Sequence, residues 1–158
     1  MKSILETSRC LIRLFQENDI ITFMKYRNHE QWMKYQQFKG LSYKKYKEIL
    51  LSKPCIEKGI QLAIIEKGNN QIIGDLFLLK EEDQYWIGYT IAPWKARQGF
   101  AYENVNCLLD YLHSINILSI YAEVDPQNIA SIHLLKKLGF VLTQDDIYVH
   151  IKRCESHS

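Results

Sequence analysis

The segment Ile87–Glu103, which reads Ile-Gly-Tyr-Thr-Ile-Ala-Pro-Trp-Lys-Ala-Arg-Gln-Gly-Phe-Ala-Tyr-Glu, constrains the fold more than any other part of the chain. A run of β-forming residues stops at Pro93, and Gly99 and Ala101 then open a segment with helical spacing of apolar residues. The first turn of a helix leaves its amide donors unpaired and carries the positive end of the helix dipole, so it attracts phosphate. Small residues there let a ligand approach the backbone. The segment therefore predicts a strand, a phosphate-binding turn and a helix.

Length and composition are those of an ordinary folded protein. The 158 residues predict one domain, spanning 1–158, and apolar residues make up 47% of the chain. A net charge of +2 does not favour nucleic acid or a membrane surface as a partner. No apolar run approaches the ~18 residues of a membrane helix. Widely spaced cysteines and the absence of a secretory leader favour free thiols and a cytoplasmic location. The cysteines are Cys10, Cys55, Cys107 and Cys154.

Strands and helices alternate along the chain without a linker or a low-complexity stretch. Strands are expected at Arg9–Phe15, Gln61–Glu66, Gln71–Leu79, Tyr85–Ala92, Ile117–Val124, Phe140–Thr143 and Ile147–Ile151. Helices are expected behind Asn18 and Asp19, behind Ser42 with Tyr46, Ile49 and Leu50 facing inward, after Gly99, and from Ser131 to a stop at Gly139. A helix between two strands makes a βαβ unit, and hairpins make the rest antiparallel. The predicted fold class is thus α/β (α+β), with a single mixed, mostly antiparallel sheet flanked by helices.

Two short motifs point to a family. Neither Gly-x-Gly-x-x-Gly nor Gly-x-x-x-x-Gly-Lys-Ser/Thr occurs in the chain. The chain does carry Asn-x-x-Ser at Asn128 and Ser131, followed by Leu-Gly-Phe at 138–140. With the turn before it, this element resembles the cofactor motifs of the GCN5-related N-acetyltransferases (GNAT), in particular the branch similar to RimJ and RimL. That family's first motif is Gln/Arg-x-x-Gly-x-Gly/Ala, and this chain departs from it only at Ala96. The opening segment Leu5–Leu14 also resembles the start of that branch.

The resemblance implies a fold and a cosubstrate. In the family the sheet splays around the βαβ unit, between the strands expected at Tyr85–Ala92 and Ile117–Val124. Coenzyme A enters that gap, where its peptide-like arm pairs with the free strand edge. The implied cosubstrate is acetyl-CoA, with no metal. The implied contacts are the strand residues Tyr89, Thr90 and Ile91, the main-chain amides of Ala96, Arg97, Gln98, Gly99, Phe100 and Ala101, and the side chain of Asn128, which also suits a helix cap.

The implied chemistry is transfer of an acetyl group from a thioester to a primary amine. Ser131 is the candidate acid, because Leu135 stands where many members of the family carry a tyrosine; alternatively its hydroxyl bonds a carbonyl one turn back. The branch often carries a glutamate base where this chain has Trp86. Asp75 and Glu66 remain as bases that would act through water, or as solvated charges at strand ends. Of these two, we favour Asp75.

The acceptor is less defined than the cosubstrate. Trp32, Tyr35 and Phe38 either line an amine pocket, since aromatic faces attract cations, or pack the first two helices. A pocket closed by aromatic residues would favour a small-molecule amine, and an open groove would favour a protein N-terminus. A different class of function is a non-catalytic acyl-CoA-binding protein, in which Trp86 and Leu135 mark lost chemistry. The sequence leaves open the acyl length and whether the chain forms a homodimer.

Overall fold

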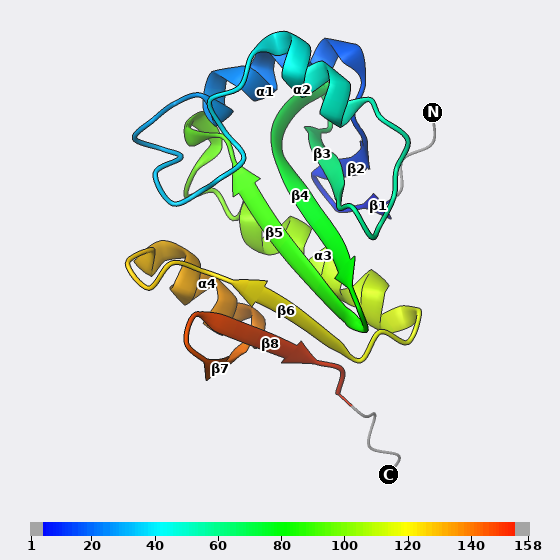
Figure 1. The fold of residues 1–158 in the computed structure, drawn as a ribbon, viewed down its shortest axis with the longest axis vertical. Coiled ribbons are helices and arrows are strands. Elements are labelled where there is room, and N and C mark those ends of the chain that lie inside the picture. Colours follow the sequence, from blue (N-terminus) through cyan, green and yellow to red (C-terminus); the bar gives the residue numbers. More distant parts are fainter. Residues whose placement is uncertain (1–4, 154–158) are drawn as a thin grey trace.

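The computed structural model describes residues 5–153, and its centre is one eight-stranded sheet (Figure 1). The strands lie in the order β1-β2-β3-β4-β5-β6-β8-β7, and only the β5–β6 pair is parallel. The predicted fold class is confirmed. The strands are β1 (Leu5–Glu6), β2 (Cys10–Leu14), β3 (Ile60–Glu66), β4 (Gln71–Glu81), β5 (Gln84–Ile91), β6 (Ser119–Glu123), β7 (Val141–Gln144) and β8 (Ile147–Ile151).

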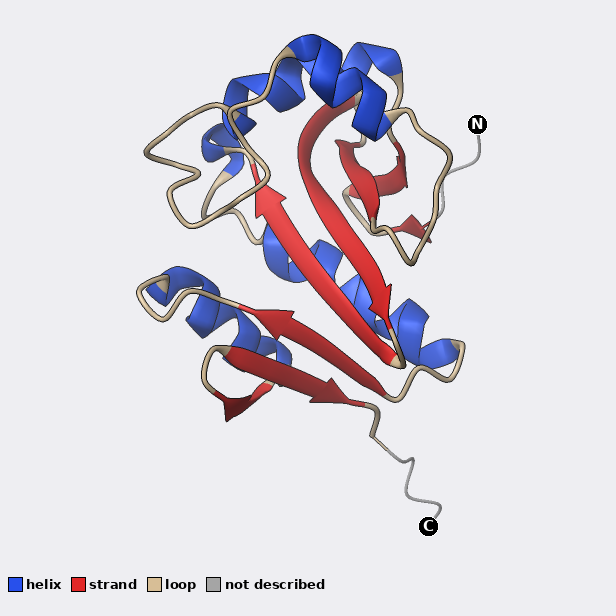
Figure 2. Ribbon diagram, viewed as in Figure 1, coloured by secondary structure: helices blue, strands red, loops and turns tan. Residues whose placement is uncertain are grey.

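Four α-helices cover the two faces of the sheet (Figure 2). They are α1 (Ile20–Arg27), α2 (Tyr43–Leu50), α3 (Phe100–Ser114) and α4 (Ile129–Leu138). Side chains alternate across β3, so Leu62 and Ile64 join the core cluster under α3 and α4, whereas Ala63 and Ile65 join the cluster under α1 and α2. Each face of the sheet therefore has its own apolar core.

The local signals at helix ends act as the sequence predicts. The Ser42 hydroxyl accepts a hydrogen bond from the amide of Lys45 at 3.2 Å, and α2 follows. Gly139 ends α4 with a φ of 102°, in the left-handed region that glycine tolerates. One detail differs: Ile49 was expected to face inward but is 43% exposed, because α2 turns Tyr46 and Leu50 toward the sheet instead.

The sheet opens between β5 and β6. The two strands pair only at Tyr85 with Ile120 and at Trp86 with Tyr121, although β5 continues to Ile91. In Figure 1 the strands separate toward the C-terminal end of β5. This is the predicted splay around the βαβ unit, and it leaves a free strand edge inside the molecule.

Two histidines link the C-terminal ends of α3 and α4 through β8. His113 Nδ1 lies 2.7 Å from the Ile117 carbonyl, His150 Nε2 lies 3.0 Å from the Leu138 carbonyl, and the other two ring nitrogens are 2.9 Å apart. Carbonyls only accept, so each histidine donates the proton of its terminal ring nitrogen to one of them. Among the charged groups near His150, Asp110 raises its pKa, whereas His113 and Arg153 lower it.

We expect the fold to lose stability as the pH falls below about 6.5, the ordinary pKa of histidine. Burial lowers the pKa of His150 in the fold, so unfolded His150 takes up a proton at a pH where folded His150 does not. The contribution of neutral His150 to the stability of the fold is present above that pH and is lost below it. Denaturant titrations at about pH 7.5 and about pH 5.5 measure how steeply the free energy of unfolding changes with pH. The variant His150→Asn should show a smaller change. The exposed histidine variant His133→Asn is the control; an equal slope in all three proteins would contradict the prediction.

Candidate active site

The predicted phosphate-binding turn lies between β5 and α3. A single 3-10 turn, Pro93–Lys95, follows the strand, and α3 begins at Phe100 after Gly99, which has a φ of 82°. Arg97 also has a positive φ, of 61°, which a non-glycine residue adopts only at a cost of roughly 1–3 kcal/mol. The amides of Phe100, Ala101 and Tyr102 have no partner within the helix. The amide of Ala96 is not free in the same way, because it donates a hydrogen bond to the Pro93 carbonyl at 3.2 Å.

Residues near the start of the chain contact this turn. Glu103, in the first turn of α3, accepts hydrogen bonds from the Thr7 hydroxyl at 2.5 Å and from Arg9 Nε at 2.7 Å. Burial alone would raise the pKa of Glu103, but these hydrogen bonds outweigh it and hold the pKa below its ordinary value. The Arg9 guanidinium also lies 3.9 Å from the centre of the Phe100 ring. Arg9 therefore balances a negative charge that would otherwise stand at the helix start.

The free edge of β5 presents alternate residues to the gap. The amide of Ala92 donates to Ile73 of β4 at 2.8 Å, so strand alternation turns the main-chain groups of Thr90 toward β4 as well. The main-chain groups of Tyr89 and Ile91 face the gap instead. The indole of Trp32 already donates to the Ile91 carbonyl at 2.9 Å. Of the three predicted strand contacts, Tyr89 therefore offers a free main-chain edge.

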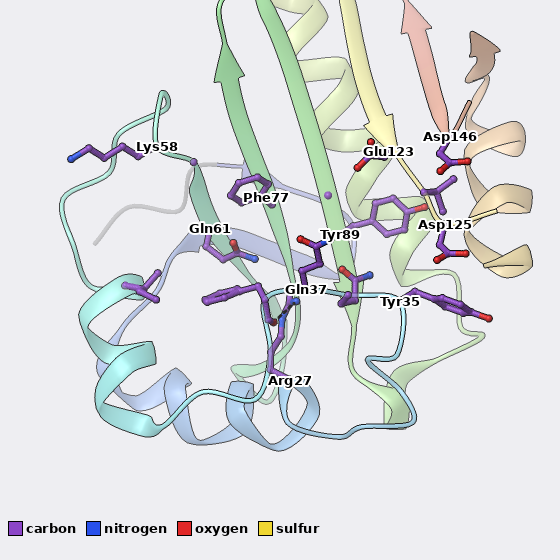
Figure 3. Close-up of a pocket in the computed structure, with 16 residues that line it drawn as sticks. Arg27, Tyr35, Gln37, Lys58, Gln61, Phe77, Tyr89, Glu123, Asp125 and Asp146 are labelled. Carbon is purple, nitrogen blue, oxygen red and sulfur yellow. Dashed lines mark hydrogen bonds between the residues drawn. The ribbon is translucent and has the colours of Figure 1, made fainter. Parts of the chain in front are cut away.

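Two adjoining cavities meet at the mouth of the gap. The larger has a volume of about 640 Å³ and the smaller about 80 Å³. Figure 3 shows the larger cavity, with acidic side chains from the end of β6 and nearby loops on one side and Gln61, Phe77 and Arg27 on the other. Both cavities are lined by Tyr35, Gln36, Gly88, Tyr89, Glu123, Val124 and Asp125.

Three of the predicted residues come together at the smaller cavity. Tyr89, Asn128 and Ser131 all line it. The side chain of Asn128 caps α4 by accepting a hydrogen bond from the amide of Ser131 at 3.2 Å. The Ser131 hydroxyl is hydrogen-bonded to the phenol of Tyr89. Leu135, one turn further along α4, also lines this cavity but can donate no proton.

Asp75 lies behind the wall of the larger cavity. Its carboxylate is fully buried and accepts hydrogen bonds from Tyr26 at 2.5 Å, from Arg27 at 2.5 Å and from Gln61 at 2.7 Å. Arg27 is buried too, so the two charges form an internal ion pair. Asp75 reaches the cavity only through Arg27 and Gln61, which line it.

Glu123 is a site residue that the sequence analysis missed. This exposed carboxylate ends β6 and lines both cavities, whereas Trp86 lines neither of those two cavities and packs on Tyr121 with ring centres 5.3 Å apart. Asp125 and Asp146 add two more carboxylates to the same side of the larger cavity, as Figure 3 shows. No periodicity or motif marks Glu123, because its position depends on where β6 diverges from β5.

The aromatic segment between α1 and α2 both lines a cavity and packs against the helices. Tyr35 and Phe38 line the larger cavity. Phe38 also packs against Phe23 and Tyr46, with ring centres 5.9 Å and 5.5 Å away. Tyr35 spans the gap, because its hydroxyl donates to the Gln127 carbonyl at 3.2 Å. The segment thus packs the helices and covers the mouth of the gap.

Other predictions concern features away from the site. Cys10, Cys55 and Cys107 are free thiols, and Cys154 lies outside the described residues. Within residues 5–153, no group of three or more His, Cys, Asp or Glu side chains is placed to share a metal ion. The helices of the same range include none with the length and apolar character needed to cross a bilayer.

Comparison with known proteins identifies the family to which this fold belongs. The family model described as "Acetyltransferase (GNAT) domain" matches residues 9–141. An uncharacterized N-acetyltransferase of Bacillus subtilis, YnaD, is 27% identical over 136 residues, which cover 84% of this chain and 79% of that protein. A GNAT-family acetyltransferase structure from Bacillus anthracis superposes with a TM-score of 0.80 at 20% identity, covering 93% of this chain and 97% of the other. RimL, a ribosomal L7/L12 α-N-protein acetyltransferase solved with coenzyme A, gives a TM-score of 0.79 at 15% identity, covering 95% and 98%. The chain therefore belongs to the GNAT acetyltransferase family.

Proposed function

We propose that the chain, as one N-acetyltransferase domain, transfers an acetyl group from acetyl-CoA to a primary amine by direct attack in a ternary complex. The observation that carries the proposal is the junction of the two cavities at the β5–β6 gap. The smaller cavity is lined by Tyr89 on the free edge of β5 and by Asn128 and Ser131 of the Asn-x-x-Ser motif, and the larger cavity adjoins it. A thioester in the smaller cavity and an amine in the larger cavity would meet beside Tyr89 and Ser131. RimL, whose fold is similar, was solved with coenzyme A.

The residues at the junction supply the remaining chemistry. Ser131 protonates the leaving thiolate, as the sequence motif suggests. We assign the base to Glu123 rather than to Asp75, because Glu123 faces both cavities while three donors surround the buried Asp75 carboxylate. Asp75 then holds Arg27 and Gln61 in the cavity wall.

The acceptor that the cavity favours is a small-molecule amine. About 640 Å³ lies inside the usual range of small-molecule sites, roughly 300–1,000 Å³. The carboxylates of Glu123, Asp125 and Asp146 would attract its ammonium group. A protein N-terminus is the second candidate, since the fold is similar to that of RimL, an α-N-protein acetyltransferase.

Calorimetry with acetyl-CoA, with ATP as competitor, tests the cosubstrate. Release of free thiol then tests turnover, with a linear triamine and a short peptide carrying a free N-terminus as acceptors. Saturable binding with thiol release supports the proposal, and the faster acceptor identifies the substrate class. Binding without thiol release from any amine would instead support the non-catalytic acyl-CoA-binding protein.

Replacing Glu123 with glutamine should lower kcat/KM at neutral pH by about 100-fold, because the attacking amine loses its base. The loss should shrink at alkaline pH, where the amine is deprotonated without help. Asp146→Asn removes the same charge from the same side of the cavity, so it should raise KM with little change in kcat. Equal pH profiles for Glu123→Gln and the unmodified protein would contradict the assignment.

A further inference from the structure

Tyr89 and Ser131 form a pair of hydroxyl groups at the point where the two cavities meet. Tyr89 comes from the free edge of β5, and Ser131 from the first turn of α4. Their side-chain oxygens are hydrogen-bonded, and the phenol also lies 3.4 Å from the Ser131 carbonyl. Both residues line the smaller cavity, and Tyr89 lines the larger one as well. A proton can therefore pass between the two cavities through this pair.

The hydrogen bond between the two hydroxyls allows the phenol to be the donor. Burial raises the pKa of Tyr89 to about 12, so the phenol keeps its proton at neutral pH. Within residues 5–153, the acceptors hydrogen-bonded to the phenol are the hydroxyl and the carbonyl of Ser131. When Tyr89 donates to the Ser131 hydroxyl, the serine proton is left to point elsewhere.

The usual competitor for the serine proton is already occupied. A serine inside a helix commonly donates to the carbonyl four residues back, which here belongs to Gln127. That carbonyl accepts from the Tyr35 hydroxyl at 3.2 Å and from the amide of Ile129 at 3.0 Å. The structure shows no hydrogen bond from Ser131 to it among the described residues. The serine proton is therefore free to face the cavity that it lines.

We propose that Tyr89 is the positioning residue behind Ser131, aiming the serine proton at the leaving sulfur and replacing that proton once it is transferred. This inference rests on the proposed function. As the carbon–sulfur bond of the thioester breaks, the sulfur keeps the bonding electron pair and takes the proton of Ser131, which takes the proton of Tyr89. The proton that Glu123 removes from the amine returns to Tyr89 across the larger cavity, which both residues line. One amine N–H is thereby exchanged for one thiol S–H, and no other reactant is needed.

The test is a double-mutant cycle on kcat, with the faster of the triamine and the peptide as acceptor. Tyr89→Phe keeps the ring and should lower kcat about 10- to 100-fold while the calorimetric Kd for acetyl-CoA stays unchanged. Ser131→Ala should lower kcat by at least the same factor. The double variant should equal Ser131→Ala, because Tyr89 acts only through that hydroxyl. Tyr121→Phe, in a half-buried tyrosine that lines neither of these two cavities, is the matched control.

Two further measurements separate this role from a purely structural one. The loss in Tyr89→Phe should shrink with a coenzyme analogue whose thiol is more acidic, since such a leaving group needs less protonation. Tyr35→Phe should lower kcat modestly, because it frees the Gln127 carbonyl to take the serine proton. Full activity of Tyr89→Phe, or multiplied losses in the double variant, would overturn the inference and leave the proposed function intact. Failure of the unmodified protein to release thiol would overturn both.

Discussion

Arg27→Ala should lower the free energy of unfolding by about 3–5 kcal/mol, because it leaves the carboxylate of Asp75 charged and buried without its counter-ion. For a chain of this length, that corresponds to a fall in Tm of roughly 6–20 °C. Denaturant titration and calorimetry at neutral pH measure both quantities. Tyr26 and Gln61 still donate to Asp75 in the variant, but neither carries a positive charge.

The double variant Arg27→Ala with Asp75→Asn tests the cause. Removing both charges should cost less than removing Arg27 alone, since no unpaired charge then remains in the core. Lys47→Ala is the matched control, because its ion pair with Glu17 is exposed to solvent and should contribute little to stability. If Arg27→Ala cost no more than this control, Asp75 would not be ionised in the fold.

Ala101→Glu should weaken the binding of acetyl-CoA on the order of a hundredfold relative to Ala101→Gln. The two side chains have nearly the same shape, so the comparison isolates one negative charge in the first turn of α3. Beside a pyrophosphate, that charge costs about 3 kcal/mol at the effective dielectric constant of a protein surface. Calorimetric titration of both variants measures the difference, which should shrink at high salt.

The same charge acts in the opposite direction on the helix. A carboxylate in the first turn of α3 interacts favourably with the helix dipole, so Ala101→Glu should be at least as stable as Ala101→Gln. Weaker binding in a protein of undiminished stability would locate the phosphates at this turn. Equal affinities in the two variants would mean that the coenzyme phosphates bind elsewhere.

The face of the sheet on which Asp75 lies could not be predicted from the sequence. Asp75 was expected to face solvent or the reaction, and which face it occupies depends on strand register. The β3–β4 ladder shifts between Ile64 and Ile65, whose partners are Gly74 and Ile72. This bulge places Ile72 and Asp75 on the same face, against α1, although an unbroken strand would separate them. Gly74 lies at this bulge and is a local signal for one, because a glycine inside a strand often marks a bulge, but it does not say which neighbours change face.

The sequence by itself determined the features that depend on neighbours along the chain. These are the order of the helices and of strands β2 to β8, the Ser42 and Asn128 caps, the stop at Gly139 and the turn that opens α3. The two-residue strand β1 was not predicted. Only the tertiary structure decided which distant groups meet: Glu123 at both cavities, Trp32 on the Ile91 carbonyl, and Tyr89 on Ser131. Caps and turns are contacts within a few residues, which propensity and spacing record. The chemistry of the site depends on strand divergence and register, which are set by packing across the whole sheet.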